Sequence, residues 1–215
     1  MIDEPQVKFR EKTAQHLIKN FKKRRFEASF APTAAQAKEE VLAMIPEGAS
    51  VYRCGTMSLT HLGFWEEVAK LPGVKLIDPY KPEYSPEEGR ALRLEGMGAD
   101  VMIASTNAVT LDGRLVNLDG AGNRVAAMCF GPKKVILVVG MNKLTADLDA
   151  ARARVKHWAA PINAMRLNLA TPCNETGLCS DCASPQRICN MWVVHERQMI
   201  EGRIHVKLVG EDMGY

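Results

Sequence analysis

The stretch KKVILVVG, residues 133–140, is apolar at every position from Val135 to Val139. A strand of this composition is typical of a parallel sheet with both faces covered, because neither face then needs polar side chains. Shorter strands alternate with helices on the amino-terminal side of this segment. The strands are predicted at residues 50–54, 74–78 and 99–105, and the helices at 59–70 and 86–97. This alternation predicts an α/β sandwich with a largely parallel sheet.

The remaining segments extend the pattern toward both ends of the chain. Apolar residues at helical spacing between Val7 and Ala28 predict a first helix, and Thr33 caps a second helix that stops at Pro46. The Asp-Gly pair at residues 112–113 lies between two β-prone runs and predicts a hairpin with a two-residue turn. The other expected elements are helices at residues 120–129, 145–158 and 161–169 and closing strands at 191–196 and 203–209.

These elements divide the chain into three predicted segments. Residues 1–48 supply N-terminal helices that pack on the domain, and residues 49–170 form the α/β domain with its hairpin insertion. Residues 171–215 hold a cysteine-rich segment and the closing strands, which we expect to form a C-terminal extension.

Composition and charge narrow the class of protein. The 215 residues are 47% hydrophobic and 25% charged, which is typical of a folded globular protein. The net charge of +3 and the single basic run at residues 22–25 indicate a solvated helix face, so no nucleic-acid partner is expected. The first residues lack a signal-peptide pattern, and no apolar run approaches the roughly 20 residues of a spanning helix. We therefore expect a cytoplasmic protein without membrane insertion.

The turn CGTMS, residues 54–58, is the first candidate ligand site. It joins a predicted strand to a predicted helix, and ligands of parallel α/β sheets lie beyond the carboxyl ends of the strands. Gly55 permits a tight turn, and the hydroxyls of Thr56 and Ser58 with the free N–H groups suit a phosphate or carboxylate. The alternative is a plain turn in which Ser58 caps the helix.

The glycine turn in NLDGAGNRVAAM, residues 117–128, is the stronger candidate for an anion. Gly120 and Gly122 precede a predicted helix whose first turn carries Asn123 and Arg124, a guanidinium suited to oxyanions. The alternative is a glycine-rich connection with Arg124 in solvent.

Two further polar residues follow predicted strands. Asn107 is a candidate for orienting a substrate, although asparagine is also an ordinary turn residue after a strand. Lys143 is interpreted as a surface residue in a loop rather than as a cation for an acidic ligand.

The segment CNETGLCSDCASPQRIC, residues 173–189, contains four of the six cysteines with the spacing C-x5-C-x2-C-x6-C. Disulfides are uncommon in a reducing compartment, so the spacing favours a metal site over a disulfide knot. Four thiolates can hold either zinc or an iron–sulfur cluster. Zinc ribbons usually bring two C-x2-C pairs, and this chain has one. We therefore predict a 4Fe–4S cluster, with zinc and unmetallated cysteines as alternatives. The predicted ligands are Cys173, Cys179, Cys182 and Cys189.

Several of these stretches together resemble the LUD-domain family of lactate-utilization proteins. They are YRCGTMSLTHLG at 52–63, the segment 98–128 from GADVMIAS to GNRVAAM, KKVILVVGMNKL at 133–144, TPCNETGLCSDCASPQRICNMWVV at 171–194 and RIHVKLVGEDMGY at 203–215. The resemblance implies a three-layer Rossmann-like fold of the superfamily that includes ribose-5-phosphate isomerase and CoA transferases. It also implies work beside iron–sulfur subunits that oxidise L-lactate to pyruvate.

The leading hypothesis is a LUD-type protein that binds a small anionic metabolite and carries an iron–sulfur cluster for electron transfer in 2-hydroxy-acid oxidation. Redox proteins are then expected partners, and a homo-oligomer is compatible with this function. One alternative is a non-redox enzyme of the sugar-phosphate isomerase or acyl-transferase type with a structural zinc. The other is a metabolite-binding regulatory module without catalysis. The sequence identifies no catalytic residue.

Overall fold

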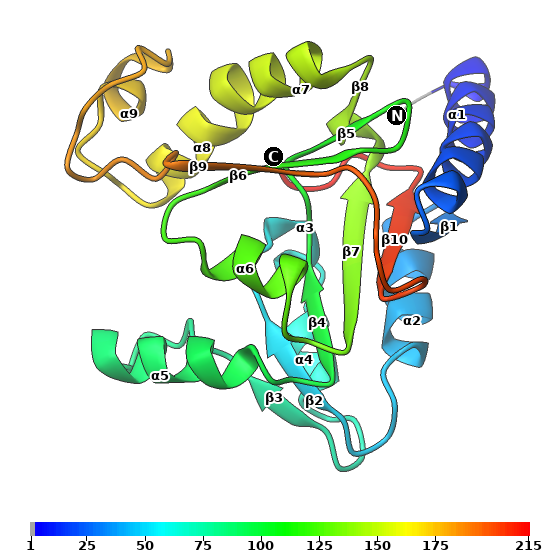
Figure 1. The fold of residues 1–215 in the computed structure, drawn as a ribbon, viewed down its shortest axis with the longest axis horizontal. Helices are drawn as coiled ribbons and strands as arrows, with labels where there is room; N and C mark the ends of the chain where they lie inside the picture. Colours follow the sequence, from blue (N-terminus) through cyan, green and yellow to red (C-terminus); the bar gives the residue numbers. More distant parts are fainter. Residues whose placement is uncertain (1–2) are drawn as a thin grey trace.

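A computed structural model describes residues 3–215 of the protein, and its main element is a six-stranded sheet with the order β1-β10-β7-β4-β2-β3 (Figure 1). Every neighbouring pair in this sheet is parallel. Its strands are β1 (Glu27–Ala31), β10 (Ile204–Val209), β7 (Lys134–Gly140), β4 (Val101–Ala104), β2 (Ser50–Arg53) and β3 (Lys75–Ile77). The predicted α/β class with a largely parallel sheet is confirmed.

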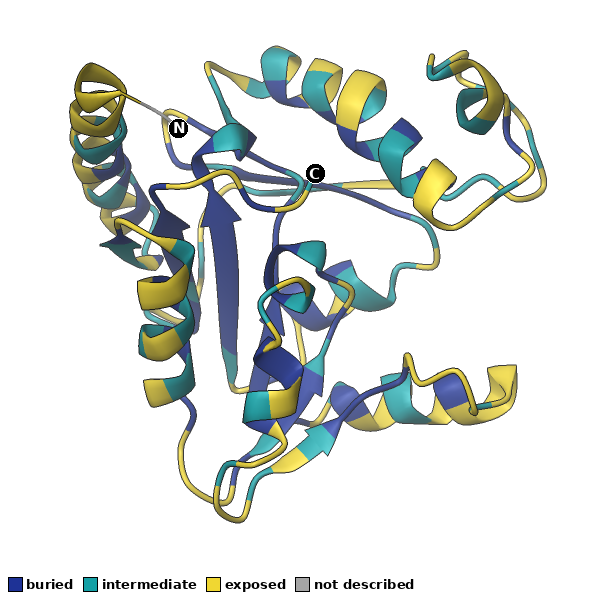
Figure 2. Cartoon of the chain, turned by 180° about the vertical axis from the view of Figure 1, so that it is seen from behind, coloured by how far each residue is buried: buried dark blue, intermediate teal, exposed yellow. Residues whose placement is uncertain are grey.

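Helices cover both faces of this sheet, which makes three layers. One face packs against α1 (Glu4–Lys23), α5 (Pro86–Gly96) and α6 (Asn123–Cys129). The other face packs against α2 (Ala34–Ala43), α3 (Met57–Thr60) and α4 (Phe64–Val68). Strand β7 sends Val135, Leu137 and Val139 to the first layer and Ile136 and Val138 to the second. It is therefore buried along almost its whole length, as its composition predicts (Figure 2).

The first helix is shorter than predicted, and a strand follows it. Helix α1 ends at Lys23, and Arg25 adopts a left-handed conformation with φ of 62° that turns the chain. The predicted helical position Ala28 instead lies in β1, where it pairs with Val206 of β10. Residues 1–48 thus contribute an edge strand as well as helices.

The predicted helix at 59–70 is two short helices. Gly63 has a φ of 62°, which separates α3 from α4 because a left-handed residue cannot continue a right-handed helix. Phe64, Trp65 and Val68 of α4 are buried against the sheet.

The last strand lies inside the sheet. Strand β10 pairs with β1 on one side and with β7 on the other, and its residues Ile204, Val206 and Leu208 are fully buried. The six-stranded sheet therefore contains strands from all three predicted segments. In the chain, the cysteine segment lies between β7 and β10, which pair with each other in this sheet.

A second sheet has the order β8-β5-β6-β9 and contains the predicted hairpin. Its strands are β5 (Ala108–Thr110), β6 (Leu115–Asp119), β8 (Leu144–Thr145) and β9 (Met191–His195). The turn of the hairpin has three residues instead of the predicted two. The Thr110 N–H donates to Arg114 O, the Gly113 N–H donates to Thr110 O, and Gly113 adopts a φ of 90°.

A continuous helical arm packs over this second sheet, where two separate helices were predicted. It consists of α7 (Leu148–Arg154), a π-helical turn η2 (Val155–Ala159) and α8 (Ala160–Arg166), and the short helix α9 (Pro172–Thr176) follows. The π-helical turn precedes Pro161, whose ring nitrogen has no N–H for the helical ladder. In Figure 1 the arm lies beyond the carboxyl ends of β4 and β7. Within residues 3–215, no helix has the length and apolar character needed to cross a bilayer.

Candidate functional site

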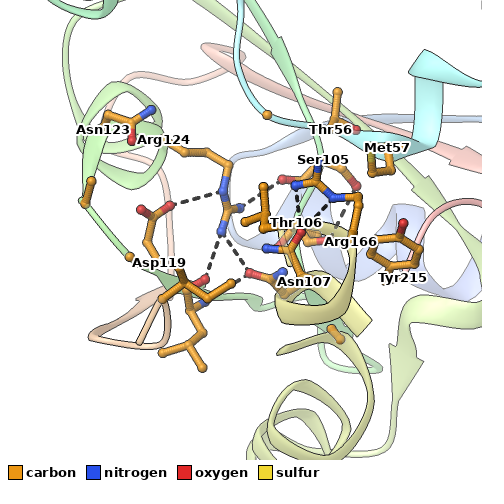
Figure 3. Close-up of a pocket in the computed structure, with 18 of the residues that line it drawn as sticks. Thr56, Met57, Ser105, Thr106, Asn107, Asp119, Asn123, Arg124, Arg166 and Tyr215 are labelled. Atoms are coloured by element: carbon orange, nitrogen blue, oxygen red, sulfur yellow. Dashed lines mark hydrogen bonds and ion pairs between the residues drawn. The ribbon is translucent and has the colours of Figure 1, made fainter. Parts of the chain in front are cut away.

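A cavity of about 600 Å³ opens at the carboxyl ends of β2, β4 and β7 (Figure 3). Gly55 and Thr56 line it after β2, residues 105–107 line it after β4, and Lys143 lines it after β7. Lys143 ends the 3₁₀ turn η1 (Met141–Lys143). Parallel α/β sheets place their ligands in this position, so the cavity is the candidate binding site.

Most of the predicted ligand residues reach this cavity. Those that line it are Gly55, Thr56, Asn107, Gly120, Asn123 and Arg124. Ser58 is buried behind the wall, where its Oγ lies 3.1 Å from Lys143 Nζ. Gly122 precedes α6 with a φ of 86° and packs against the Met191 side chain.

The turn after β2 bonds its polar groups within the protein. The Gly55 N–H donates to the Tyr80 hydroxyl at 2.9 Å, and the Ser58 N–H donates to Thr56 Oγ1 at 3.2 Å. Burial raises the pKa of Tyr80 to about 12, so this phenol keeps its proton near neutral pH. Tyr80, which the sequence did not single out, also lines the cavity, and its hydroxyl lies beside the Cys54 thiol.

Arg124 builds the wall of the cavity. Its two Nη groups donate within the protein to Ser105 O at 3.1 Å, Asn117 Oδ1 at 2.5 Å, Asn107 Oδ1 at 2.8 Å and Leu118 O at 3.2 Å. Its Nε lies 3.2 Å from Asp119 Oδ2 in an ion pair. Most of the donor capacity of Arg124 is therefore used inside the protein, and its geometry is that of a positioning residue.

Asn107 and Gly120 have specific structural partners. Asn107 Oδ1 accepts from Arg124 and from the Leu118 N–H, which fixes the amide plane at the cavity. At Gly120 a Cβ would lie 3.2 Å from Ile188 O, so glycine allows the cysteine segment to approach closely.

Lys143 is buried, and its interpretation as a surface residue is wrong. Only 4% of it is exposed, and its Nζ lies 3.1 Å from Ser58 Oγ and 2.9 Å from Ser105 Oγ. The 3₁₀ turn after β7 returns the side chain toward the sheet. The sequence feature that could have identified Lys143 is its position, because it is a cation three residues after the end of the most apolar strand.

Burial lowers the pKa of Lys143 to about 7 from its usual value of 10.5, and the charges of Arg154 and Arg124 act in the same direction. Near neutral pH a substantial fraction of this amine is therefore uncharged. Such a shift within a cavity is typical of functional lysines.

Among the three arginines that line the cavity, Arg166 is the one without a carboxylate partner within residues 3–215. Its Nε and Nη2 both donate to Asn163 Oδ1, at 3.0 and 2.8 Å. By contrast, Arg53 pairs with Asp78 and Arg124 pairs with Asp119. Figure 3 shows Arg166 extending from α8 over the cavity. Its guanidinium gives the cavity an excess of positive charge, which favours an anion.

The four cysteines of the segment line one separate pocket beside α8. Arg187 organises this segment, since its guanidinium donates to Cys182 O at 2.6 Å and to Cys189 O at 3.0 Å. The cysteines form no disulfide. Across residues 3–215, no three His, Cys, Asp or Glu side chains converge as the ligands of a single metal ion do.

The cavity and the cysteine pocket share a wall. Ile188 lines both, and α8 with its preceding turn supplies Ala159 and Asn163 to the cavity and Ala160 and Ala164 to the cysteine pocket. The two sites are therefore separated by about one layer of residues.

The fold and the site define a Rossmann-like α/β domain with a cationic cavity at the carboxyl ends of its strands. The LUD domain model matches residues 14–209, and the chain belongs to this family. The predicted family resemblance is confirmed. No curated protein sequence matches the chain.

Three solved structures are similar to the chain to different degrees. A DUF162 family protein from Deinococcus radiodurans is 12% identical with a TM-score of 0.50, over 93% of this chain and 97% of that one. Ribose 5-phosphate isomerase A from Neisseria gonorrhoeae is 17% identical with a TM-score of 0.34, over 56% and 60%. The eIF2B delta subunit from Chaetomium thermophilum is 21% identical with a TM-score of 0.33, over 53% and 48%. At these identities the comparisons concern the fold alone, and the first of them carries that conclusion.

Arg124→Met is expected to lower the free energy of unfolding by about 3–5 kcal/mol, because it leaves the Asp119 carboxylate buried without its cation. Lys143→Met is the matched change in the same cavity, and it is expected to leave this free energy unchanged or higher at pH 7. The Ser58 and Ser105 hydroxyls still donate to backbone carbonyls in that variant. Urea unfolding measures the free energy of unfolding of both variants and of the wild type. Equal losses in the two variants would contradict the different roles assigned to them.

Proposed function

We propose that this LUD-domain protein binds a small anionic metabolite in the cavity and carries an iron–sulfur cluster on Cys173, Cys179, Cys182 and Cys189. Its function would be electron transfer linked to the oxidation of lactate or another 2-hydroxy acid. The observation that carries the proposal is the shared wall, because Ile188 and α8 separate an anion-binding cavity from a four-cysteine pocket.

The charge of the cavity supports an anionic ligand. Arg166 has free donor capacity at Nη1, and the Asn107 amide adds a neutral donor around the same space. The one acidic side chain among the lining residues, Asp119, is paired with Arg124 and accepts from the Gly122 N–H. A carboxylate or phosphate would therefore meet donors without a free acidic side chain opposite it.

The four thiols that would hold the cluster line one pocket. A 4Fe–4S cluster binds one thiolate at each of its four irons, so four cysteines around one pocket are the number that it needs. Lys156 and Arg187, which both contact Asp181, bring positive charge near the thiolates. When bound, such a cluster would supply one-electron transfer.

The same observations bear on the alternatives. An acidic catalytic residue is typical of isomerases of the sugar-phosphate type, and the acidic side chain that lines the cavity, Asp119, is paired with Arg124. All six cysteines lie within the described residues and are free thiols, which supports the proposed cytoplasmic location. Redox proteins and further copies of the chain are the proposed partners.

Addition of L-lactate or pyruvate is expected to raise the melting temperature, because a ligand that binds only the folded state stabilises it. Arg166→Met should weaken binding roughly ten- to hundredfold, since it removes a charged donor. Arg152→Met is the control, because this arginine is 57% exposed on α7 and does not line the cavity. Equal shifts in wild type and the Arg166 variant would remove Arg166 from the site.

Anaerobic purification and reconstitution are expected to give a brown protein with iron and acid-labile sulfide in a 4:4 ratio, about one cluster per chain. Cys182→Ser should lose most of this iron and sulfide. Cys129→Ser should keep them, because Cys129 is an exposed thiol outside the cysteine pocket. A colourless protein with stoichiometric zinc would refute the iron–sulfur cluster. It would not affect the proposed anion site, which the melting-temperature experiment tests separately.

A further inference from the structure

The two serines beside Lys143 have fixed hydrogen-bonding roles. The Ser105 hydroxyl donates to Val138 O at 2.6 Å, and the Ser58 hydroxyl donates to Met213 O at 3.4 Å. A hydroxyl has one proton to donate. With these protons directed to backbone carbonyls, both serine oxygens accept hydrogen bonds from Lys143 Nζ.

These two acceptors match an uncharged amine. A neutral lysine has two N–H groups and one lone pair, and the two serines accept both N–H groups. The lone pair then has no partner, in a side chain that lines the cavity. A charged ammonium has three N–H groups, and the third would have no acceptor among the described residues. Because Lys143 is only 4% exposed, this unpaired N–H would be buried, which disfavours the charged form.

The surrounding charges oppose protonation as well. Arg154 of α7 and Arg124 of α6 are the charged groups that act on the amine, and both are cations. Arg154 is held in place because it donates to Asn142 O at 2.9 Å and to Asn107 O at 2.7 Å. Burial and these two guanidinium groups together lower the pKa of Lys143 to about 7.

We propose that Lys143 is a nucleophile that forms an imine with the carbonyl carbon of a small anionic oxo compound, either a 2-oxo acid or an oxo phosphate. This inference rests on the proposed anion site, because Arg166 would hold the carboxylate or phosphate while the amine meets the carbonyl. A 2-oxo acid is also the product class of 2-hydroxy-acid oxidation.

The step is balanced within the cavity. The lone pair of Nζ forms a bond to the carbonyl carbon, and the π electrons of the C=O bond move to oxygen. A proton passes from nitrogen to that oxygen and gives a carbinolamine. The oxygen then takes a second proton from solvent water and leaves as water, while the nitrogen lone pair forms the C=N bond of an iminium. Loss of the remaining N–H proton to solvent gives the neutral imine. No oxidant or reductant takes part.

The test traps this imine in the wild-type protein. The full chain is incubated with sodium pyruvate or with dihydroxyacetone phosphate in the presence of sodium cyanoborohydride, and intact mass and peptide mapping follow. We expect one reduced adduct per chain, located on Lys143, from one or both probes. Which probe reacts distinguishes a 2-oxo acid from an oxo phosphate. L-Lactate, which has no ketone, should give none.

Variants and pH provide independent readouts. Lys143→Arg should lose the adduct, whereas Lys133→Arg should keep it because Lys133 is 79% exposed and paired with Asp100 at the surface. The initial labelling rate should rise about tenfold between pH 6 and pH 8, as the amine loses its proton near pH 7. Absence of an adduct with both probes, or labelling spread over surface lysines, would overturn the proposal.

Failure of this inference is distinguishable from failure of the anion site. If pyruvate raises the melting temperature of wild type but not of the Arg166→Met variant and no adduct forms, the anion site stands and the nucleophile is refuted. If neither probe shifts the melting temperature or forms an adduct, both are refuted.

Discussion

The guanidinium of Arg124 is the contact on which the arrangement of the site depends. Its acceptors lie at the end of β4, in the turn before β5 and along β6, so one side chain joins the six-stranded sheet to the second sheet. The cavity occupies the junction of these two sheets. Because both Nη groups of Arg124 donate to protein acceptors and its Nε is paired with Asp119, this cation mainly holds the two sheets together.

Those other groups are two cations in different environments. Arg166 extends from α8 and has only an amide as a partner, so it keeps its charge and can hold an anion. Lys143 is buried between two hydroxyls that accept from it, so its neutral form fits best. The cavity thus offers one permanent positive charge and one amine with a free lone pair. Ile188 and α8 place the four cysteines directly behind this cavity.

The sequence was most informative where one local pattern decided the structure. The apolar run at 135–139 predicted a strand buried on both faces, and the helices Pro86–Gly96 and Asn123–Cys129 matched closely because glycine or capping residues mark their ends. Strand β1 was missed because EASFA continues the helical spacing of α1, and only pairing with β10 makes it a strand. That pairing joins residues 178 apart in the chain (Glu27 with His205), which no local pattern records.

The residues of the site, like the elements of the fold, were predicted where a local pattern marks them and were missed where the three-dimensional structure alone places them. The glycine turn and Asn107 were singled out because they follow predicted strands, and the cysteine cluster because four thiols lie within 17 residues. Lys143 was considered and placed at the surface, because the sequence cannot show that the 3₁₀ turn after β7 buries it. Arg166 was not singled out, since no local pattern marks an arginine near the end of a helix as part of the cavity. For Arg124 the sequence could not show the protein acceptors that its Nη groups meet.

The measurement that tests this account most directly is an NMR titration of the protein labelled with ¹³C at the ε-carbon of lysine, with Lys143→Arg used to assign the Lys143 signal. The account predicts that this signal titrates with a midpoint near pH 7, while exposed lysines titrate near about 10.4. A Lys143 signal that titrates together with the exposed lysines would show a charged side chain at neutral pH and contradict the central claim.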